Sequence, residues 1–440
     1  MSDTPIAAVV LAAGLGTRMR SAVPKHFHTL LGRRMVDWVI LAAEGIGASP
    51  VVVVASPQSR ELFDDVEVVV QEHPRGTGDA ARAARAALEG RSEHVLVLSG
   101  DAVLLTGELL SELVAAHLGS GAAATVLGIE YDDARDYGRL VRDTDGLLTR
   151  IVEAGDASAE ELQIRAANSA IYVFRSEKLW PLLDRLEPHN AQGELYLTDT
   201  IGLLVEAGED VAVHIAGEAF EAGVNTRAEL ADAAAALRDR INKRHMLAGV
   251  TIVDPTTTWI EPEVEIEADA TIHPFTILRG VTRVAAGAEI HANSVAVDAD
   301  IGTGASVGPF CYLRPGTVIR ADSKAGTFVE IKNSRIGPRA KVPHLSYIGD
   351  AEIGEDTNIG AGAITANFPH KPGLPKGRTR IGKDVRTGVQ NGFIAPVEVG
   401  DGAWTAAGSI ITKDVPPDAL AVARVRQENK EGYAARHRDD

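Results

Sequence analysis

The chain has little cysteine, few aromatic residues and no long apolar run. Its 440 residues include one cysteine, Cys311, so a disulfide within the chain is excluded and a reducing compartment is expected. No stretch approaches the roughly 18 to 20 apolar residues that span a bilayer. The segment before Ile6 lacks the basic residues that begin a signal peptide. We therefore expect a soluble, cytoplasmic protein with no membrane partner.

The balance of charge narrows the kinds of partner. Acidic residues outnumber basic ones by 61 to 44, which gives a formal net charge of −17. Nucleic-acid binding calls for a basic face, so no nucleic-acid partner is expected. Phosphorylated substrates are still compatible with this charge, because a few local Lys and Arg residues outweigh a distant acidic surface.

Residues 1–226 alternate between strand and helix patterns. Short β-branched runs occupy residues 6–11, 51–54, 66–70 and 94–98, and helical patterns lie between them, as at 78–88 and 107–118. Continuous apolar strands with helical crossovers indicate a parallel sheet covered on both faces. The first domain is predicted to be a doubly wound, Rossmann-like α/β fold.

A long connecting helix is predicted over residues 227–249. Leu230, Ala234, Leu237 and Ile241 recur at spacings of three and four, which makes one helical face apolar. Thr226 can cap the helix, with Glu229 completing a capping box.

The region 250–440 has a period of six residues, which matches neither a helix nor an alternating strand. Such a period is typical of a parallel β-helix, in which each aliphatic residue stacks on its equivalent one coil away. Residues 367–380 interrupt the repeat and are expected to loop out. The repeating positions are Ile266, Ile272, Leu278, Val284, Ile290, Ile301, Val307, Leu313, Ile319, Ala325, Ile331, Ile336, Val342, Ile348, Ile381, Thr387, Phe393, Val399, Thr405 and Ile411.

A glycine-rich turn follows the first predicted strand. Glycines there let backbone N–H groups approach phosphates, and Arg18 and Lys25 add positive charge. Alone, this turn is equally compatible with an ordinary tight strand–helix connection. The wider pattern is more specific, and it resembles the sugar-nucleotide pyrophosphorylases. It comprises residues 11–19, Pro24-Lys25, Gln71, Gly76-Thr77-Gly78, Ser99-Gly100-Asp101, and residues 137–139, 151–153, 168–170, 193–199 and 223–225.

Together with the predicted β-helix, the pattern resembles one family over essentially the whole chain. Its members combine an N-acetylglucosamine-1-phosphate uridylyltransferase with a glucosamine-1-phosphate acetyltransferase. The resemblance implies a left-handed β-helix, the substrates UTP, glucosamine-1-phosphate, N-acetylglucosamine-1-phosphate and acetyl-CoA, and UDP-N-acetylglucosamine as product. It also implies a homotrimer in which coenzyme A lies between neighbouring β-helices.

The resemblance assigns roles in the first domain residue by residue. Asp101 and Asn225 are expected to hold Mg²⁺, a hard cation suited to oxygen ligands. Arg18 and Lys25 are expected to neutralise charge during transfer. Gln71 and Gly76 are expected to contact uracil, and the amino sugar is expected at Gly138, Glu153 and Asn168. Further substrate contacts are expected at Leu11, Ala12, Ala13, Gly14, Thr77, Ser99, Gly100 and Asn225.

The resemblance also assigns an acetyl-transfer site in the second domain. His344 is the candidate general base, because imidazole side chains titrate near neutral pH. The sugar phosphate and its surroundings are expected at Arg314, Lys332, Tyr347, Asn358 and Lys376. Acetyl-CoA is expected at Ala361, Asn367, Phe368, Val389, Ala407 and Arg424.

Several positions depart from the family pattern and put specificity in question. They are Asp79, Ala102, Val103, Ala170, Phe368 and Val389. Two other functions remain open on the sequence alone. One is a pyrophosphorylase whose β-helix only regulates or oligomerises, which the His344, Tyr347 and Lys332 set disfavours. The other is a non-catalytic subunit, which the presence of Lys25 and Asp101 disfavours.

Overall fold

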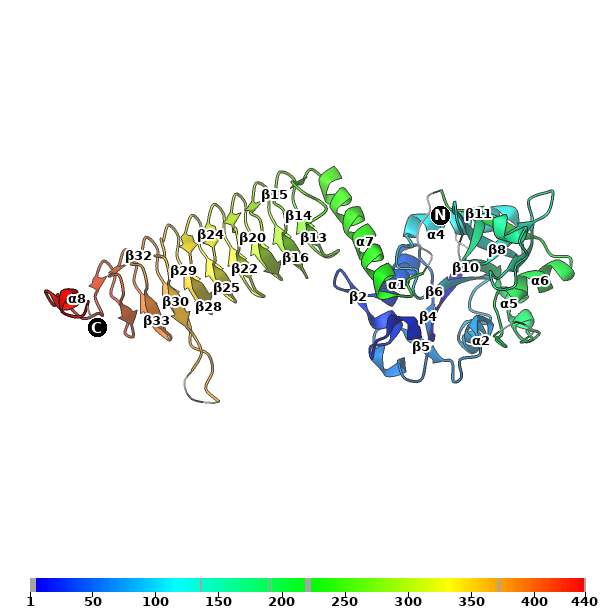
Figure 1. Cartoon of the computed structure of the whole chain (residues 1–440), viewed down its shortest axis with the longest axis horizontal. Helices are drawn as coiled ribbons and strands as arrows, with labels where there is room; N and C mark the ends of the chain where they lie inside the picture. Colours follow the sequence, from blue (N-terminus) through cyan, green and yellow to red (C-terminus); the bar gives the residue numbers. More distant parts are fainter. Residues whose placement is uncertain are drawn as a thin grey trace. The chain divides into compact units, whose positions relative to one another are not determined.

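The computed structural model describes residues 5–134, 137–188, 190, 192–217, 223–369, 371 and 373–438 (Figure 1). The chain divides into two compact units, Met1–Leu237 and Arg238–Asp440. The first is an α/β unit and the second is a stack of short strands.

The α/β unit is built on a sheet with the strand order β11-β7-β10-β6-β1-β4-β5. A two-stranded ribbon of β8 (Arg139–Arg142) and β9 (Leu148–Val152) joins it through β10, and β2 (Thr29–Leu30) pairs with β3 (Arg33–Arg34). The main strands are β1 (Ile6–Ala12), β4 (Val51–Ala55), β5 (Glu67–Val70), β6 (His94–Ser99), β7 (Ala124–Glu130), β10 (Ala166–Arg175) and β11 (Val211–Ile215).

Helices cover both faces of this sheet, which confirms the predicted Rossmann-like fold. Buried side chains of α1 (Met35–Gly45) and α4 (Gly107–Ser120) pack against one face. The other face is covered by α2 (Thr77–Ala83), α3 (Arg85–Leu88), α5 (Ser176–Leu183) and α6 (Asp199–Glu206). Aliphatic side chains dominate both cores, as the scarcity of aromatic residues predicts.

The sheet is mixed, so the prediction of an entirely parallel sheet is wrong at one strand. β10 runs antiparallel to both β6 and β7. The chain reaches β10 from β7 through the β8–β9 ribbon rather than through a crossover helix, and a parallel return requires such a crossover. The remaining neighbours β1, β4, β5 and β6 are parallel, and β1 and β6 end at one edge of the sheet.

The predicted connecting helix is α7 (Arg227–Leu247). Thr226 caps it, accepting a hydrogen bond from the backbone N–H of Glu229 at 3.2 Å. The Glu229 carboxylate accepts from the N–H of Asn225 at 2.6 Å, one residue before the position that a capping box predicts. Ala233 and Leu237 are buried in a cluster with Met19 and other residues of the α/β unit. The first half of α7 therefore completes the core of that unit.

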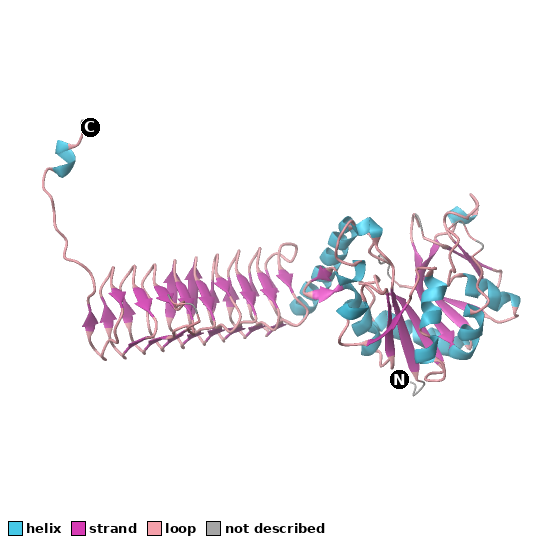
Figure 2. Cartoon of the chain, turned by 90° about the horizontal axis from the view of Figure 1, so that it is seen from below, coloured by secondary structure: helices cyan, strands magenta, loops and turns pink. Residues whose placement is uncertain are grey.

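The second unit is the predicted left-handed β-helix, with three faces of parallel strands that Figure 2 shows as stacked rows. The first face contains β12 (Thr251–Ile252), β15 (Thr271–Ile272), β18 (Glu289–Ile290), β21 (Ser306–Val307), β24 (Lys324–Thr327) and β27 (Lys341–His344), and later β32 (Arg386–Thr387), β35 (Trp404–Thr405) and β37 (Leu420–Ala421).

The other two faces are equally regular. The second face contains β13 (Trp259–Ile260), β16 (Ile277–Arg279), β19 (Val295–Val297), β22 (Tyr312–Leu313), β25 (Glu330–Lys332), β28 (Tyr347–Gly349), β30 (Ile364–Ala366), β33 (Gly392–Ile394) and β36 (Ile410–Ile411). The third face contains β14 (Glu265–Ile266), β17 (Arg283–Val284), β20 (Asp300–Ile301), β23 (Val318–Ile319), β26 (Arg335–Ile336), β29 (Ala351–Ile353), β31 (Thr379–Ile381) and β34 (Val397–Val399).

The hexapeptide positions line the interior of the coils. Every predicted repeat position except Ile266 is buried, and Ile266, in one of the first strands of the stack, is half-buried. Strand pairing joins residues three hexapeptides apart, as between Ile272 and Ile290. Stacked aliphatic side chains therefore form the core of this unit.

The predicted excursion lies between β30 and β31, and residues 370 and 372 within it lie outside the described residues. After the last coil the chain includes one short helix, α8 (Tyr433–Arg436). Among the described residues, no helix combines the length and apolar character needed to cross a membrane.

Candidate active sites

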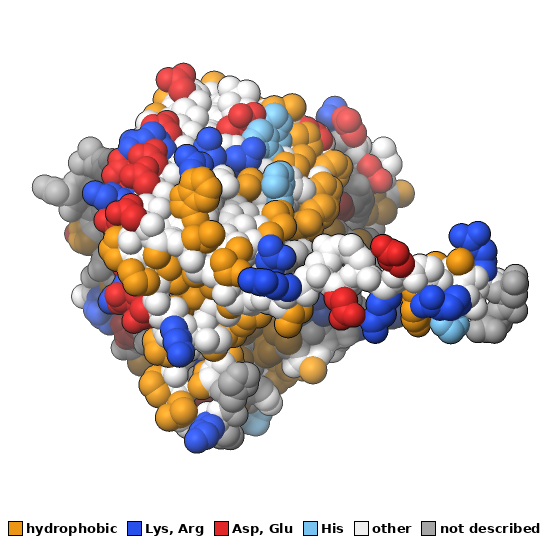
Figure 3. All heavy atoms as spheres, turned by 90° about the vertical axis from the view of Figure 1, so that its left-hand side faces the viewer, with side chains coloured by type: hydrophobic (Ala, Val, Ile, Leu, Met, Phe, Trp, Pro, Cys, Tyr) orange, Lys and Arg blue, Asp and Glu red, His pale blue; other side chains and the backbone are white. Residues whose placement is uncertain are grey.

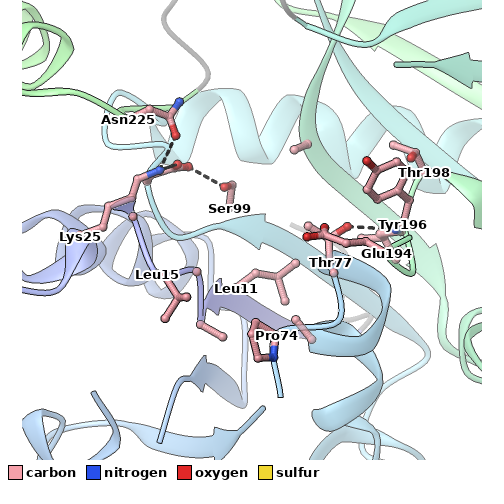
Figure 4. A pocket seen from close by; sticks show the side chains of 18 of the residues that line it. Leu11, Leu15, Lys25, Pro74, Thr77, Ser99, Glu194, Tyr196, Thr198 and Asn225 are labelled. Carbon is pink, nitrogen blue, oxygen red and sulfur yellow. Dashed lines mark hydrogen bonds and ion pairs between the residues drawn. The ribbon is translucent and has the colours of Figure 1, made fainter. Parts of the chain in front are cut away.

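A pocket of about 690 Å³ opens at the edge of the α/β sheet where β1 and β6 end (Figure 4). Lys25, Asn225 and Ser99 lie at one end of it, while Thr77, Tyr196 and Thr198 lie at the other. Most of the substrate, catalytic and metal residues predicted for the first domain line this one cavity. They are Leu11, Ala13, Gly14, Arg18, Lys25, Gln71, Gly76, Thr77, Ser99, Asp101, Gly138, Glu153, Asn168 and Asn225.

Ala12 and Gly100 lie beneath the pocket rather than along its wall. Ala12 is 3% exposed and packs in the sheet core. The backbone N–H of Gly100 donates to the carbonyl of Leu11 at 2.9 Å. A Cβ added to Gly100 would lie 2.8 Å from that carbonyl oxygen and 3.1 Å from the His26 ring. Gly100 therefore has room for no side chain, and both residues shape the floor of the site.

The glycine-rich turn packs directly against the Lys25 side chain. Gly16 has a φ of 61°, and an added Cβ would lie 2.4 Å from the Cβ of Lys25. Arg18 lies in the short 3₁₀ helix η1 (Thr17–Met19) that follows, and Lys25 begins η2 (Lys25–Phe27). The turn thus brings the Lys25 side chain to the sheet edge.

Five polar side chains converge at the end of the pocket that holds Lys25. The Lys25 ammonium forms an ion pair with Asp101 and donates to the amide oxygen of Asn225 at 2.7 Å. Arg18 donates to the same oxygen at 3.0 Å, and the Ser99 hydroxyl donates to Asp101 at 2.6 Å. Burial alone would raise the pKa of Asp101, but Lys25, His26 and these hydrogen bonds outweigh it and hold that pKa below its usual range.

The same oxygens fit a divalent cation. Asp101 offers a carboxylate and Asn225 a carbonyl, which are hard ligands of the kind that Mg²⁺ prefers. Both oxygens contact one ammonium group, so they face a common point. In the protein without a bound cation, the Lys25 ammonium supplies the positive charge at that point.

His26 is a pocket residue to which the sequence argument assigned no role. It is buried, and desolvation lowers its pKa to about 4, although Asp101 raises the value in part. The imidazole is therefore neutral at neutral pH. Its position directly after the Pro24-Lys25 motif was the available signal.

The pocket is also lined by residues for which the sequence predicts no individual role. They are Leu15, Gly16, Thr17, Pro74, Ala80, Tyr137, Ala170, Tyr172, Glu194, Tyr196, Leu197 and Thr198.

Gln71 has a fixed side-chain orientation. Its amide NH₂ donates to Asp79 at 2.9 Å and to the carbonyl of Gly76 at 3.1 Å. Asp79 is in turn paired with Arg82 at 2.5 Å. An ionised carboxylate only accepts hydrogen bonds, so the nitrogen of Gln71 must face Asp79. The Gln71 carbonyl oxygen is therefore the group left for a ligand.

Glu153 and Asn168 lie near one another at the other end of the pocket. The Asn168 N–H donates to the Gly138 carbonyl at 2.8 Å, and a Cβ on Gly138 would lie 3.4 Å from the Glu153 carboxylate. Burial raises the pKa of Glu153, and a hydrogen bond from the Thr198 hydroxyl offsets this rise only in part. Two residues after Asn168, Ala170 has a φ of 59°. This left-handed conformation favours glycine, which is the residue usual at this position in the family.

In the β-helix, the predicted cations Arg314, Lys332 and Lys376 lie near one another, and Arg314 also pairs with Glu330 at 2.8 Å. Strand register places Arg314, Lys332 and Gly349 in one column on the second face. The Tyr347 ring lies beside Gly349. The adjacent Lys376 ammonium lowers the pKa of Lys332, first through side-chain contact and then through charge repulsion. Like charges held this close favour binding of an anion.

His344 is exposed at the end of β27, three residues before Tyr347. Asn358 lies on the same face as His344, where its backbone forms parallel β-bridges with Lys341 and with Arg386. The structure thus places these two predicted residues on the coils next to the basic column.

The predicted coenzyme A residues occupy successive coils. Gln390 N–H donates to the Ala361 carbonyl at 2.7 Å, and Gly408 N–H donates to the Val389 carbonyl at 2.9 Å. Ala407 precedes Gly408, and a Cβ on Gly408 would lie 3.8 Å from the Arg424 side chain. Ala361, Val389, Ala407 and Arg424 therefore follow one edge of the stack.

Asn367 and Phe368 begin the excursion with opposite environments. Asn367 is buried, and its side-chain amide donates to one carboxylate oxygen of Asp350. The other oxygen of Asp350 accepts from the Asn333 amide at 2.5 Å. Phe368 is 76% exposed. Asn367 thus anchors the start of the excursion, and Phe368 presents its ring to solvent.

The fold and the pocket define a nucleotidyltransferase joined to a hexapeptide-repeat β-helix. Residues 8–249 match the MobA-like NTP transferase domain family, which is more than half of the chain. The chain is 48% identical to the bifunctional protein GlmU of Streptomyces coelicolor, over 99% of this chain and 95% of that protein. It is 44% identical to the GlmU proteins of Corynebacterium efficiens, over 99% and 95%, and Mycobacterium tuberculosis, over 98% and 92%. The chain belongs to the bifunctional GlmU family and is a bifunctional transferase.

Proposed function

We propose that the α/β pocket carries out uridylyl transfer and that the basic column of the β-helix carries out acetyl transfer, so that one chain makes UDP-N-acetylglucosamine in two steps. Acetyl-CoA first acetylates glucosamine-1-phosphate. The N-acetylglucosamine-1-phosphate formed then reacts with UTP and releases pyrophosphate. The observation that carries the proposal is the convergence of Lys25, Asp101 and Asn225 in one unit and of Arg314, Lys332 and Lys376 in the other.

Uridylyl transfer needs charge neutralisation more than proton removal. A phosphate oxygen of the sugar phosphate attacks the α-phosphorus of UTP, and the bond to pyrophosphate breaks. The nucleophile is already an anion, so the protein must stabilise converging negative charge and align the groups in line. Arg18 and Lys25 supply fixed cations for this purpose, and Mg²⁺ held by Asp101 and Asn225 supplies further charge when it is bound.

The orientation of Gln71 accounts for a preference for uracil. Its free carbonyl oxygen accepts a hydrogen bond, and uracil offers one from N3–H. Cytosine has an acceptor at N3 and would place two acceptors together. Asp79, one of the departures from the family pattern, fixes this orientation and so supports UTP as the nucleotide.

The acetyl-transfer step needs a base and a holder for phosphate. We assign the phosphate to Arg314, Lys332 and Lys376. His344 takes a proton as the 2-amino nitrogen of the sugar attacks the thioester carbonyl, and coenzyme A leaves as the thiol. The edge formed by Ala361, Val389, Ala407 and Arg424 is assigned to coenzyme A, with Asn367 and Phe368 at the excursion.

Exposed apolar side chains along one corner of the β-helix support self-association. Phe275, Phe310, Phe328 and Leu345 are 50% to 61% exposed, and the rings of Phe310 and Phe328 stack at 5.3 Å. Figure 3 shows apolar side chains exposed among charged ones on the face it presents. A row of this kind marks a protein–protein contact. We propose a cytoplasmic homotrimer, which light scattering would show as three times the mass of one chain.

One incubation tests the two-step function. Purified protein receives glucosamine-1-phosphate, acetyl-CoA, UTP and Mg²⁺, and the products are identified by mass. UDP-N-acetylglucosamine is expected only when every component is present. If this incubation shows no acetylation of glucosamine-1-phosphate, but the protein uridylylates N-acetylglucosamine-1-phosphate supplied in a second incubation with UTP and Mg²⁺, the result would instead support a pyrophosphorylase with a regulatory β-helix.

A further inference from the structure

Two histidines and a glutamate form a cluster on the first face of the β-helix. They are His273, Glu289 and His291, and none of them has a part in the two transfer sites. One nitrogen of each histidine and one carboxylate oxygen all lie within 4.8 Å of one another. All three side chains are half-buried, so the cluster is both accessible and partly enclosed.

The register of the coils explains why these residues meet. Thr271 pairs with Glu289 and Ile272 with Ile290, so residues 273 and 291 follow in one column. Ile272 and Ile290 point into the core, and their neighbours in the strand therefore point outward. The N–H of His273 donates to the Ile290 carbonyl at 2.9 Å, which fixes the spacing of the two backbones. The rings of His273 and His291 stack with centroids 5.2 Å apart.

The contacts within the cluster resemble those of a metal site with its outer support. His273 Nε2 lies 2.8 Å from a Glu289 oxygen, and His291 Nδ1 lies 3.7 Å from the same oxygen. The other nitrogen of His291, Nε2, lies 3.1 Å from the Ser306 hydroxyl on the next coil. A histidine that ligates a metal commonly uses its second nitrogen in such a hydrogen bond, which fixes the ring orientation.

We propose that His273, Glu289 and His291 bind one divalent transition-metal ion, best matched by Zn²⁺. The ligand atoms are His273 Nε2, His291 Nδ1 and a Glu289 oxygen, with water in the remaining position. Imidazole and carboxylate together suit Zn²⁺ rather than Mg²⁺, which prefers oxygen ligands. The ligand atoms must draw together to reach bonds of roughly 2.0 to 2.2 Å, which rotation of half-exposed side chains permits. The metal would cross-link two neighbouring coils.

The test measures zinc uptake by the full chain without a histidine tag. Chelator-treated protein is titrated with Zn²⁺ by calorimetry in excess Mg²⁺, so that zinc is disfavoured at Asp101. His273→Gln and Glu289→Gln each remove one ligand, and Ser306→Ala removes only the support of His291. Glu265→Gln is the matched control, because Glu265 is an exposed coil glutamate paired with Arg283 at 3.1 Å. Circular dichroism checks that each variant is folded.

The proposal expects one zinc site per chain to be lost in His273→Gln and in Glu289→Gln and to be kept in Glu265→Gln. Ser306→Ala should keep the site with an affinity about ten- to a hundredfold weaker. Co²⁺ should give the visible absorption of a nitrogen-ligated site in the wild type and lose it in His273→Gln. Equal uptake and equal spectra in all variants would overturn the proposal and leave a hydrogen-bonded surface pair.

Discussion

Replacing Asp101 by alanine separates the two activities of the chain. The change removes a predicted metal ligand and also the counter-ion of Lys25, and both residues are at most 9% exposed. Loss of one charge-stabilising group in such a site costs on the order of a hundredfold or more in rate. At about 1.36 kcal/mol per tenfold, a hundredfold loss is about 2.7 kcal/mol of transition-state stabilisation.

The same substitution also affects stability, and the size of that effect sets the assay. Removing one partner of a buried ion pair costs about 3 to 5 kcal/mol. The lower value is expected here, because Lys25 keeps the Asn225 oxygen at 2.7 Å. Uridylylation and acetylation are therefore measured on the same folded preparation of Asp101→Ala. Uridylylation should fall at least about a hundredfold with acetylation unchanged. An equal fall in both activities would refute the assignment and indicate misfolding.

Three further predictions follow from the α/β unit. The pKa of His26 is lowered from 6.5 to about 4, so the folded state resists protonation and the free energy of unfolding falls as pH drops below about 6.5. His26→Gln should remove roughly 2 kcal/mol of this loss of stability between pH 7 and pH 5, as measured by urea unfolding. An unchanged pH slope would contradict this. A fragment of residues 1–247 should keep uridylyl transfer. A fragment of residues 1–226 should melt at a lower temperature, because it lacks α7 and exposes Met19. Equal melting temperatures would show that α7 does not complete the core of the α/β unit. Asp79→Asn should let the Gln71 amide turn over and reduce the preference for UTP over CTP by about tenfold, whereas Arg82→Gln, as the control, should change it little.

The β-helix was the part of the fold best predicted from the sequence. Each hexapeptide places one aliphatic residue in the interior, so the pattern is local and repeats. The direction of β10 was not predictable in the same way. Its residues read as a buried strand whichever way it runs, and only the short β8–β9 connection decides its direction.

The pocket residues were predicted as a set, but their contacts were not. The motifs place Lys25, Asp101 and Asn225 after separate strands, and the sequence does not show that one ammonium joins the other two. The buried state of His26 and the link from Asp79 to Gln71 also depend on packing between distant segments. Such contacts arise only when the sheet edge is assembled.

The most direct test of the account is the reciprocal variant in the β-helix. His344→Ala should lower acetylation of glucosamine-1-phosphate by about a hundred- to ten-thousandfold, chiefly in kcat, because a positioned base contributes that much. Uridylylation by the same protein should remain close to the wild-type rate, since His344 is exposed and the buried aliphatic stack carries the fold. Acetylation within about threefold of the wild type would show that His344 is not the base, and the assignment of acetyl transfer to this site would fail.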